Sequence, residues 1–313
     1  MKRIIIFSLL ALMATGLHAQ SLLTVPNDAR TMSMADATFA TSDNAFGAIA
    51  NPASFVLGKK NFSVGLNYTY FQPGKIYGQT HIPNLAAAYR INDRWSVSLN
   101  AGSFLMKGYE SWNKDTDLSI GACPHEIFVS AGVGFRIIDQ FSVGANIRYF
   151  NSSLANETII PGYRCGNAVS ADIALMYAVR GIGIAAGVSD IGSKVKYGES
   201  AVAPHRMPMS TKLGISYDLF LGKHNELTFT VQSNWYPYVS SFAFSASVEY
   251  TLNDYLFVRG GYRYADGKQI MPSYGSAGIG GKVAGVSLAG AYLIAPSNSP
   301  LHNTFSLNLS YEF

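Results

Sequence analysis

The chain has 313 residues, of which 48% are apolar, 13% are aromatic and only 13% are charged. The charged share is about half of the roughly 25% found in ordinary globular domains, which argues against a surface that faces water everywhere. The 18 Phe and 19 Tyr argue against a disordered chain. No apolar run reaches the roughly 18 to 20 residues that a transmembrane helix needs. The composition therefore indicates a surface that avoids water without transmembrane helices.

The N-terminus has the three parts of a secretory signal peptide. Lys2 and Arg3 are the basic region, Ile4–Ala14 is the apolar region, and Leu17-His18-Ala19 is the cleavage site. We predict a signal peptide over residues 1–19; the alternative is an uncleaved anchor helix. Without Lys2 and Arg3 the chain keeps 21 basic and 19 acidic residues, a balance that does not indicate nucleic-acid binding.

From residue 61 to the C-terminus, apolar and polar residues alternate with a period of two. Phe62, Val64, Leu66, Tyr68 and Tyr70 alternate with small or polar residues, which places the apolar side chains on one face of a strand. We predict about fourteen such strands. Their approximate centres are Leu66, Ala86, Leu99, Ala131, Ala145, Ile173, Ile184, Ile215, Phe229, Ala246, Gly260, Ile279, Leu288 and Leu307.

The connections between these strands alternate in length. Short turns are expected at residues 92–93, 139–140, 180–181, 222–225, 253–254 and 284–285, and longer connections at 72–82, 107–126, 151–168, 190–209, 235–240, 265–274 and 295–302. Outer-membrane barrels have short periplasmic turns and long external loops. A soluble β-sandwich also alternates, but here the apolar faces carry no charge. We predict an all-β fold, a transmembrane antiparallel β-barrel over residues 61–313, in the bacterial outer membrane.

Aromatic residues gather at the ends of the predicted strands, as in the interfacial belts of membrane barrels. The chain ends in an alternating strand that carries Tyr311 and Phe313. This ending resembles the C-terminal signal that barrel assembly machinery reads. Outer-membrane lipid and that machinery are therefore expected partners. The strand-end tyrosines are Tyr68, Tyr70, Tyr149, Tyr177, Tyr217, Tyr250, Tyr262, Tyr264, Tyr292 and Tyr311.

Charged residues fall on the opposite face of the strands, where they would be costly against hydrocarbon and must line the lumen. Because both signs occur, we expect salt bridges that fill the lumen rather than a selective ion path. The charges are Arg136, Arg148, Asp172, Lys212, Asp218, Glu249, Arg259, Arg263 and Glu312. Glycines on the strands leave room for a plug or permit curvature: Gly65, Gly132, Gly134, Gly144, Gly187, Gly214 and Gly261.

Residues 20–60 lack the strand pattern and are rich in Ala, Asp, Asn and Met. One interpretation is a periplasmic leader with a short helix and a turn at Asn51-Pro52. The other is a hatch segment that folds back into the lumen as a plug. The residues that distinguish this segment are Asp28, Arg30, Asn44, Asn51, Pro52 and Ala53.

This segment resembles the opening of the PorV/PorQ family of Bacteroidota, which is related to the FadL-like transporters. The resemblance rests on Asp28-Ala29-Arg30, the Met32/Met34 pair, Asp43-Asn44-Ala45 and Asn51-Pro52-Ala53, with Pro208 before the Leu213–Tyr217 strand as a second stretch. It implies a 14-stranded barrel with the Asn-Pro-Ala segment inside as a hatch. PorV-like members receive cargo of the type IX secretion system, whereas FadL-like members admit hydrophobic molecules. This chain is short, with modest external loops.

Motifs for catalysis or cofactor binding were not found. The sequence has no complete Gly-x-Ser-x-Gly elbow, no His-Glu-x-x-His and no P-loop. The five histidines beyond the signal peptide fall one to a loop or turn, which predicts solvated side chains rather than a zinc site. We expect neither an enzyme nor a cofactor; a Ser/His lipase site assembled across strands is the less favoured alternative. The histidines are His81, His125, His205, His224 and His302.

Cys123 and Cys165 are the only cysteines, and both lie in long connections on the same rim. An oxidising compartment permits a disulfide, so the sequence leaves two options, a Cys123–Cys165 bridge or two free thiols.

The sequence leaves three functions open. The favoured one is a secretion-associated barrel of the PorV/PorQ kind, whose partners are type IX secretion components or secreted cargo. The alternative is a FadL-like channel for a hydrophobic ligand. A scaffold barrel without transport is the third.

Overall fold

The computed structural model describes residues 21–26, 28–41, 44–71, 79–107, 109–113, 118–122, 124–153, 155, 162–200, 202–267, 271–299 and 301–313. The predicted signal peptide and Cys123 lie outside these residues. No helix in the described ranges is long and apolar enough to cross a bilayer.

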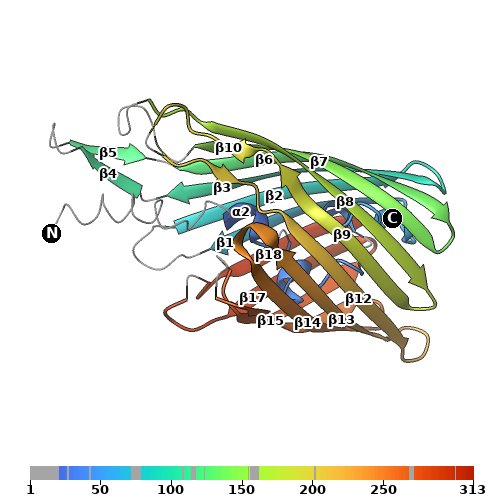
Figure 1. Ribbon diagram of the computed structural model, residues 1–313. Coiled ribbons are helices and arrows are strands. Elements are labelled where there is room, and N and C mark those ends of the chain that lie inside the picture. Colours follow the sequence, from blue (N-terminus) through green and yellow to red (C-terminus); the bar gives the residue numbers. More distant parts are fainter. Residues whose placement is uncertain are drawn as a thin grey trace.

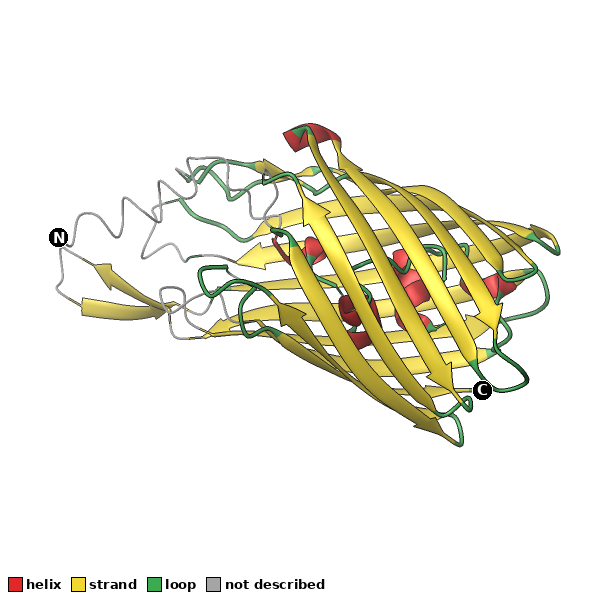
Figure 2. Cartoon of the chain, turned by 90° about the horizontal axis from the view of Figure 1, so that it is seen from below, coloured by secondary structure: helices red, strands yellow, loops and turns green. Residues whose placement is uncertain are grey.

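Fourteen antiparallel strands close into a barrel (Figures 1 and 2), and each predicted strand centre lies within one of them. The first strand pairs with the last, so the sheet has no free edge. The barrel strands are β1 (Phe62–Phe71), β2 (Gln79–Arg90), β3 (Trp95–Lys107), β6 (His125–Ile138), β7 (Phe141–Ser153), β8 (Gly166–Val179), β9 (Ile182–Gly192), β12 (Ser210–Phe220), β13 (Glu226–Tyr236), β14 (Ser241–Leu252), β15 (Leu256–Ala265), β16 (Tyr274–Val283), β17 (Val286–Ile294) and β18 (Phe305–Glu312).

The two rims differ in the length of their connections, as predicted. The C-terminus lies at the rim of the short turns (Figure 1), which is the periplasmic rim of an outer-membrane barrel. Two long connections hold small hairpins that the sequence does not predict, because segments of two to five residues are too short to show alternation. These are β4 (Tyr109–Asn113) with β5 (Leu118–Ala122), and β10 (Lys194–Val195) with β11 (His205–Arg206). One more short helix, η2 (Pro237–Val239), follows β13.

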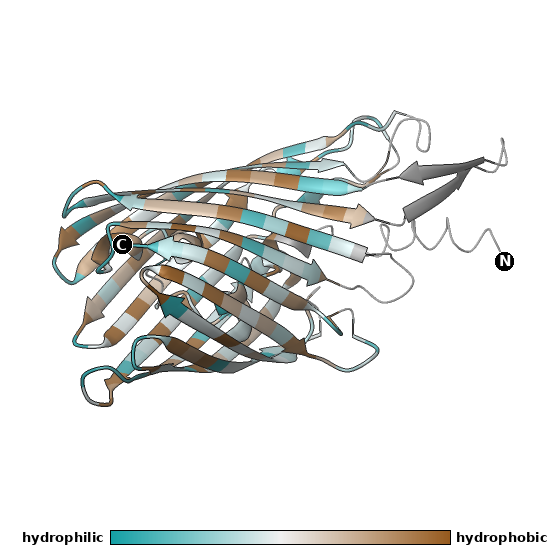
Figure 3. Ribbon diagram, turned by 180° about the vertical axis from the view of Figure 1, so that it is seen from behind, coloured by the Kyte–Doolittle hydropathy of each residue, from teal (hydrophilic) through white to brown (hydrophobic). Residues whose placement is uncertain are grey.

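Each strand has one apolar outer face and one buried face. In β8, Val169 and Ile173 are 48% and 55% exposed, while Ser170 and Asp172 between them are buried. Figure 3 shows the same alternation as bands of apolar and polar residues along the strands. No described segment of the chain packs on this outer face, and in a membrane barrel a face of this kind meets lipid. The shortage of charge in the composition is thus a property of this outer face.

Exposed aromatic side chains lie near both rims, at the height of the two membrane interfaces. Tyr149 and Tyr264 lie toward the external rim, and Tyr177 and Tyr217 toward the periplasmic rim; all four are at least 40% exposed. At the C-terminus, the Phe313 carbonyl oxygen accepts hydrogen bonds from the backbone nitrogens of residue 61 (2.8 Å) and residue 62 (3.0 Å). The C-terminal residue therefore takes part in closing the barrel.

The chain before β1 lies inside the barrel over the ranges that the structure describes, residues 21–26, 28–41 and 44–60. We call its described residues between 21 and 60 the lumenal segment. It forms α2 (Ser21–Thr24), α3 (Ala29–Ser33), α4 (Ala45–Ala50) and η1 (Phe55–Leu57), which Figure 2 shows enclosed by strands. Helix α3 packs on β15 to β18, α4 on β1, β2, β3 and β6, and η1 on β2, β3, β6 and β7. The lumenal segment thus touches wall strands from both halves of the sequence.

Candidate functional site

The candidate site is the lumen, filled by the lumenal segment, and its helices begin at two of the predicted hatch residues. The Asp28 carboxylate accepts hydrogen bonds from the backbone nitrogens of Arg30 and Thr31, each at 3.2 Å. The Asn44 side-chain oxygen accepts one from the Gly47 nitrogen at 2.7 Å. Both residues are N-caps, which satisfy free N–H groups at a helix start. Helices of five and six residues are unstable alone, so the barrel wall must hold them.

Asn51, Pro52 and Ala53 form a buried bend against the wall. The Asn51 amide nitrogen donates to the Phe39 carbonyl oxygen (2.7 Å), and its side-chain oxygen accepts from the Ala53 nitrogen (3.0 Å). The Ser142 hydroxyl on β7 donates to the Ala53 carbonyl oxygen at 2.6 Å. Asn51 and Ala53 are both fully buried. The bend therefore has its own internal hydrogen bonds and one to the wall.

Glycines on the wall make this close approach possible. Gly134 and Gly144 are direct cross-strand partners on β6 and β7. A Cβ at Gly134 would lie 2.5 Å from the Pro52 carbonyl oxygen, and one at Gly144 would overlap the Pro52–Ala53 peptide. The sequence left open whether the strand glycines allow curvature or a plug. Contact with the lumenal segment accounts for Gly65, Gly134, Gly144, Gly187, Gly214 and Gly261, whereas Gly132 faces Ser98.

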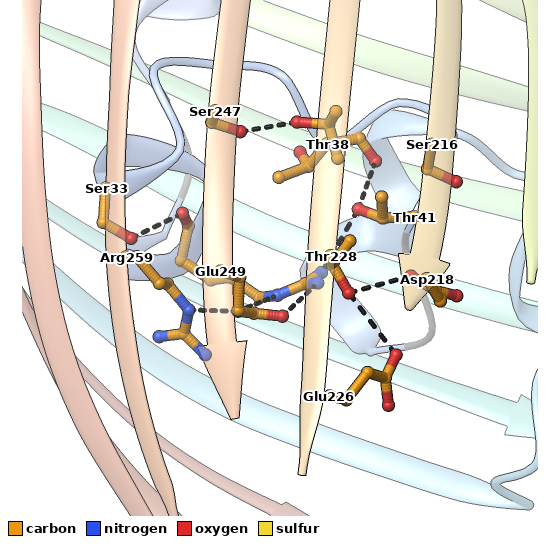
Figure 4. A network of polar contacts seen from close by, with 12 residues as sticks. Ser33, Thr38, Thr41, Ser216, Asp218, Glu226, Thr228, Ser247, Glu249 and Arg259 are labelled. Carbon is orange, nitrogen blue, oxygen red and sulfur yellow. Dashed lines mark hydrogen bonds and ion pairs between the residues drawn. The ribbon is translucent and has the colours of Figure 1, made fainter. Parts of the chain in front are cut away.

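An ionic cluster joins the lumenal segment to β14 and β15. The Arg30 guanidinium binds the Glu249 carboxylate through two hydrogen bonds, Nε to Oε2 at 3.0 Å and Nη2 to Oε1 at 2.9 Å. Arg259 pairs with the same carboxylate (Figure 4). On β15, Arg263 Nη1 lies 2.8 Å from the Asp36 carboxylate. Bidentate arginine–carboxylate pairs fix orientation as well as distance, so these contacts set how α3 sits in the barrel.

A second ionic cluster lies on β7, β8 and β9. Arg148 on β7 pairs with Asp172 on β8 at 3.3 Å and with Asp190 on β9. The Asn146 amide donates to Asp172 at 2.8 Å. Asp190 is missing from the predicted lumen charges because residues 190–209 were predicted as a connection, whereas β9 continues to Gly192. The β8–β9 register shifts next to Asp172, and Ser189 and Asp190 are both buried there. Such a bulge breaks the parity on which the prediction depends.

The other predicted lumen charges lie outside these two clusters of ion pairs. Arg136 lies 3.8 Å from the exposed Asp93 at the periplasmic rim. The Lys212 ammonium sits 5.8 Å from the centre of the Phe39 ring. Asp218 accepts a hydrogen bond from the Thr228 hydroxyl at 2.8 Å. Glu312 pairs with Lys60 and with Lys282.

A small polar cavity lies between the lumenal segment and the wall. It has a volume of about 60 Å³ and is lined by Asp36, Arg148, Asp172, Asp190 and Lys212 together with hydroxyl groups and parts of α2 and α4. A single water needs roughly 10 to 15 Å³ of such space, so this cavity holds a few waters. Its charge and size do not suit a hydrocarbon.

Toward the external rim the lumen is filled by apolar side chains. Val25 and Met32 of the lumenal segment belong to this cluster with inward-facing residues of the wall. Burial raises the pKa of the Tyr197 phenol in the β10–β11 connection above its usual range, so this side chain stays neutral. The wall residues include Ile82, Phe104, Phe128, Phe150, Tyr274 and Leu293.

One loop histidine differs from expectation. His205 is only 8% exposed and packs 5.7 Å from the Tyr197 ring, because β11 turns it inward. Within the described residues no group of three or more His, Cys, Asp or Glu side chains is placed to hold a metal ion. Cys165 is exposed; its predicted partner Cys123 lies outside the described residues, so the bridge stays a prediction.

A family model described as "Type IX secretion system protein PorV" matches residues 14–237, well over half of the chain. The chain belongs to the PorV family. It is an outer-membrane β-barrel protein. A comparison with curated proteins finds no match.

Solved structures similar to this PorV-family chain include two toluene transporters and a FadL homologue. The Ralstonia pickettii toluene transporter TbuX superposes with a TM-score of 0.62 at 14% identity, over 93% of this chain and 99% of TbuX. A Pseudomonas aeruginosa FadL homologue gives 0.55 at 13% identity, over 92% and 99%. The Pseudomonas putida toluene transporter TodX gives 0.56 at 14%, over 91% and 98%. At these identities the likeness concerns the fold.

Proposed function

We propose that this PorV-family barrel works in type IX protein secretion, where its external rim binds a secretion component or secreted cargo at the outer membrane. The observation that carries the proposal is the filled lumen of a chain that matches the PorV family. The lumenal segment contacts wall strands in both halves of the barrel, and the cavity described between it and the wall is charged and has a volume of about 60 Å³. A barrel filled in this way offers its surface, rather than a pore, to partners.

Within this proposal residues 1–19 are a cleaved signal peptide, 20–60 are a hatch and 61–313 are the membrane barrel. The hatch residues act through their contacts: Asp28 and Asn44 as helix caps, Arg30 as the ionic link to Glu249, and Asn51, Pro52 and Ala53 as the bend. The protein has no catalytic role in this proposal, and barrel assembly machinery inserts it by its C-terminal strand.

The second candidate is a channel for hydrophobic small molecules. The apolar cluster at the external end of the lumen favours it, and two of the similar structures are named toluene transporters. The ionic clusters below that apolar region weigh against it, because a hydrocarbon would have to pass buried charges.

Deletion of the gene in the source bacterium tests the secretion role. We expect secreted and surface-attached proteins to disappear from the cell surface and medium and to accumulate in the periplasm, as measured by quantitative mass spectrometry of each fraction. Complementation with the wild-type gene should restore them, whereas an unrelated outer-membrane barrel should not. Unchanged fractions in the deletion strain would contradict the role.

Planar bilayers test the hatch separately. The full barrel should show a closed trace, and a variant lacking residues 21–60 should show a higher single-channel conductance. An unchanged closed trace after deletion would contradict a plug. Uptake of toluene into liposomes by the full barrel, absent for the protein denatured before reconstitution, would favour the channel over the secretion role.

A further inference from the structure

Four exposed cations lie together at the external rim, on the connection that joins β9 to β12 and on the chain just before β8. Lys194 and Arg206 are direct cross-strand partners in the β10–β11 pair. Lys196 follows on the same face of this pair. Arg164 lies on the neighbouring segment, which a β-bridge between Tyr163 and Gly198 joins to this connection. The Arg164 Cβ is 3.3 Å from the position that a Cβ on Gly198 would occupy. We call Arg164, Lys194, Lys196 and Arg206 the cationic rim patch.

The alternation of the hairpin shows that this patch faces outward. Val195, Tyr197 and His205 are buried and pack into the apolar cluster at the external end of the lumen. Their neighbours Lys194, Lys196 and Arg206 are exposed on the opposite side. The same holds for Arg164, whose neighbour Tyr163 stacks on Tyr197 with ring centres 5.5 Å apart. The patch is therefore on the outside of the barrel.

The patch concentrates positive charge in an unusual way. Like charges directly opposite one another on paired strands destabilise the pair, yet Lys194 faces Arg206. Among the described residues, no carboxylate forms an ion pair with any of the four cations. From residue 193 to residue 206 the sequence has one acidic residue, Glu199, and it is exposed. The four cations are therefore available to an anion from outside the described part of the chain.

The position of the patch indicates where that anion comes from. Ile191 of β9 is 43% exposed on the lipid face, and Lys194 follows three residues later, at most roughly 10 Å further along the strand. The Arg206 guanidinium lies 4.7 Å from the centre of the Tyr238 ring, and Tyr238 and Trp235 are both exposed. Exposed Trp and Tyr mark the membrane interface. The cations therefore stand at headgroup level, directly above a surface that acyl chains cover.

We propose that the cationic rim patch binds the phosphate groups of an outer-leaflet glycolipid of the lipid A type, with the acyl chains on the apolar surface of β8, β9 and β12 below. Arg and Lys are the side chains that pair with phosphate oxygens. Val169, Ile191 and Leu213, each more than 40% exposed, supply that apolar surface. The bound phosphates would also relieve the repulsion between Lys194 and Arg206.

The test titrates the full-length mature protein in detergent with bisphosphorylated lipid A and with its dephosphorylated form, and reads bound lipid by native mass spectrometry. The test variant is K194Q/K196Q/R206Q. Its matched control, R94Q/R180Q/K223Q, removes three exposed cations from periplasmic turns. Because each Lys or Arg near an anionic surface contributes several-fold to affinity, we expect the test variant to bind phosphorylated lipid A roughly 10- to 100-fold more weakly. The control should bind like the wild type.

The shift in gel mobility between unheated and heated samples, which a folded barrel shows and an unfolded one lacks, checks that every variant is folded. R164Q alone should weaken binding by a smaller factor, about three- to fivefold, and 0.5 M salt should weaken wild-type binding.

Equal affinity of the test variant and the wild type, or equal binding of dephosphorylated lipid A, would overturn the proposal. If inorganic phosphate bound as tightly as the lipid, the patch would be a site for a free anion. If the test variant lost an acidic protein but kept its affinity for the lipid, the patch would be a site for a protein partner. Either result would overturn the lipid site.

Discussion

The outer and inner faces of the same fourteen strands are held by different kinds of interaction. On the outer face, residues such as Leu99 and Ile147 are about 60% exposed and face only lipid. On the inner face, residues such as Glu249 and Ser142 each have a defined partner in the lumenal segment. An outer position requires only an apolar side chain, whereas an inner position requires one particular neighbour.

This difference determines which amino-acid substitutions should destabilise the protein. A change on the outer face should matter only if it places charge in hydrocarbon, and its cost should depend on depth. A substitution on the inner face should destabilise the protein through the loss of one contact. The loss of stability should be smaller when the partner residue is replaced as well. The three predictions below test this contrast from the largest effect to the smallest.

Replacing Glu249 by Gln should have the largest effect, since it leaves Arg30 and Arg259 buried beside each other without their shared carboxylate. Removing one partner of a buried ionic pair costs about 3–5 kcal/mol. Chemical unfolding in lipid vesicles should show a loss of this size in the free energy of unfolding. The control D254N, in an exposed pair with His224, should change it by less than about 1 kcal/mol. If R30Q/E249Q were as unstable as the sum of both single changes, the specific contact would be wrong.

Replacing Ile147 by Arg places a charge on the outer face at the middle of β7, where Ile147 is 58% exposed. Arg at the midplane of a barrel costs about 2–4 kcal/mol, and near an interface about 0–1 kcal/mol. The same unfolding assay should therefore rank I147R well below F220R, which changes an equally exposed residue at the periplasmic end of β12. Equal losses at the two depths would show that this face does not meet lipid.

Replacing Gly134 by Ala should have the smallest of the three effects. The new methyl group would lie 2.5 Å from the Pro52 carbonyl oxygen, and overpacking of this kind costs about 1–3 kcal/mol. The control G260A adds the same methyl group to a strand glycine whose nearest neighbouring atom would be 3.7 Å away. Protease should cleave the lumenal segment faster in G134A than in G260A. Identical cleavage would mean that the segment does not dock on β6 and β7.

The contrast also explains what the sequence could predict. All fourteen barrel strands were predicted because lipid on one side forces a period of two, and the same parity placed Arg148, Glu249 and Arg263 on the inner face. Asp190 was missed because the predicted strand ended before it, and the β9 bulge that turns it inward follows no period of two.

The partners of the inner residues could not be predicted either. Asp36 and Arg263 are 227 positions apart, and the lumenal segment carries no periodicity that would align it with the strands. The distinguishing residues Asp28, Arg30 and Asn51 were visible in the sequence. Their individual contacts depend on where each strand stands in the closed barrel.

The lumenal segment packs on both sides of the seam where β1 pairs with β18. Helix α3 packs on β17 and β18, while α4 packs on β1 and β2, so the segment spans both sides of the junction where the sheet closes. Lys60, at its end, pairs with Glu312 across the same junction. When β1 pairs with β18, it is therefore already linked to the lumenal segment, which packs against strands on both sides of the seam. We expect the segment to act as an internal template for barrel assembly, which brings together chain ends that are otherwise about 250 residues apart.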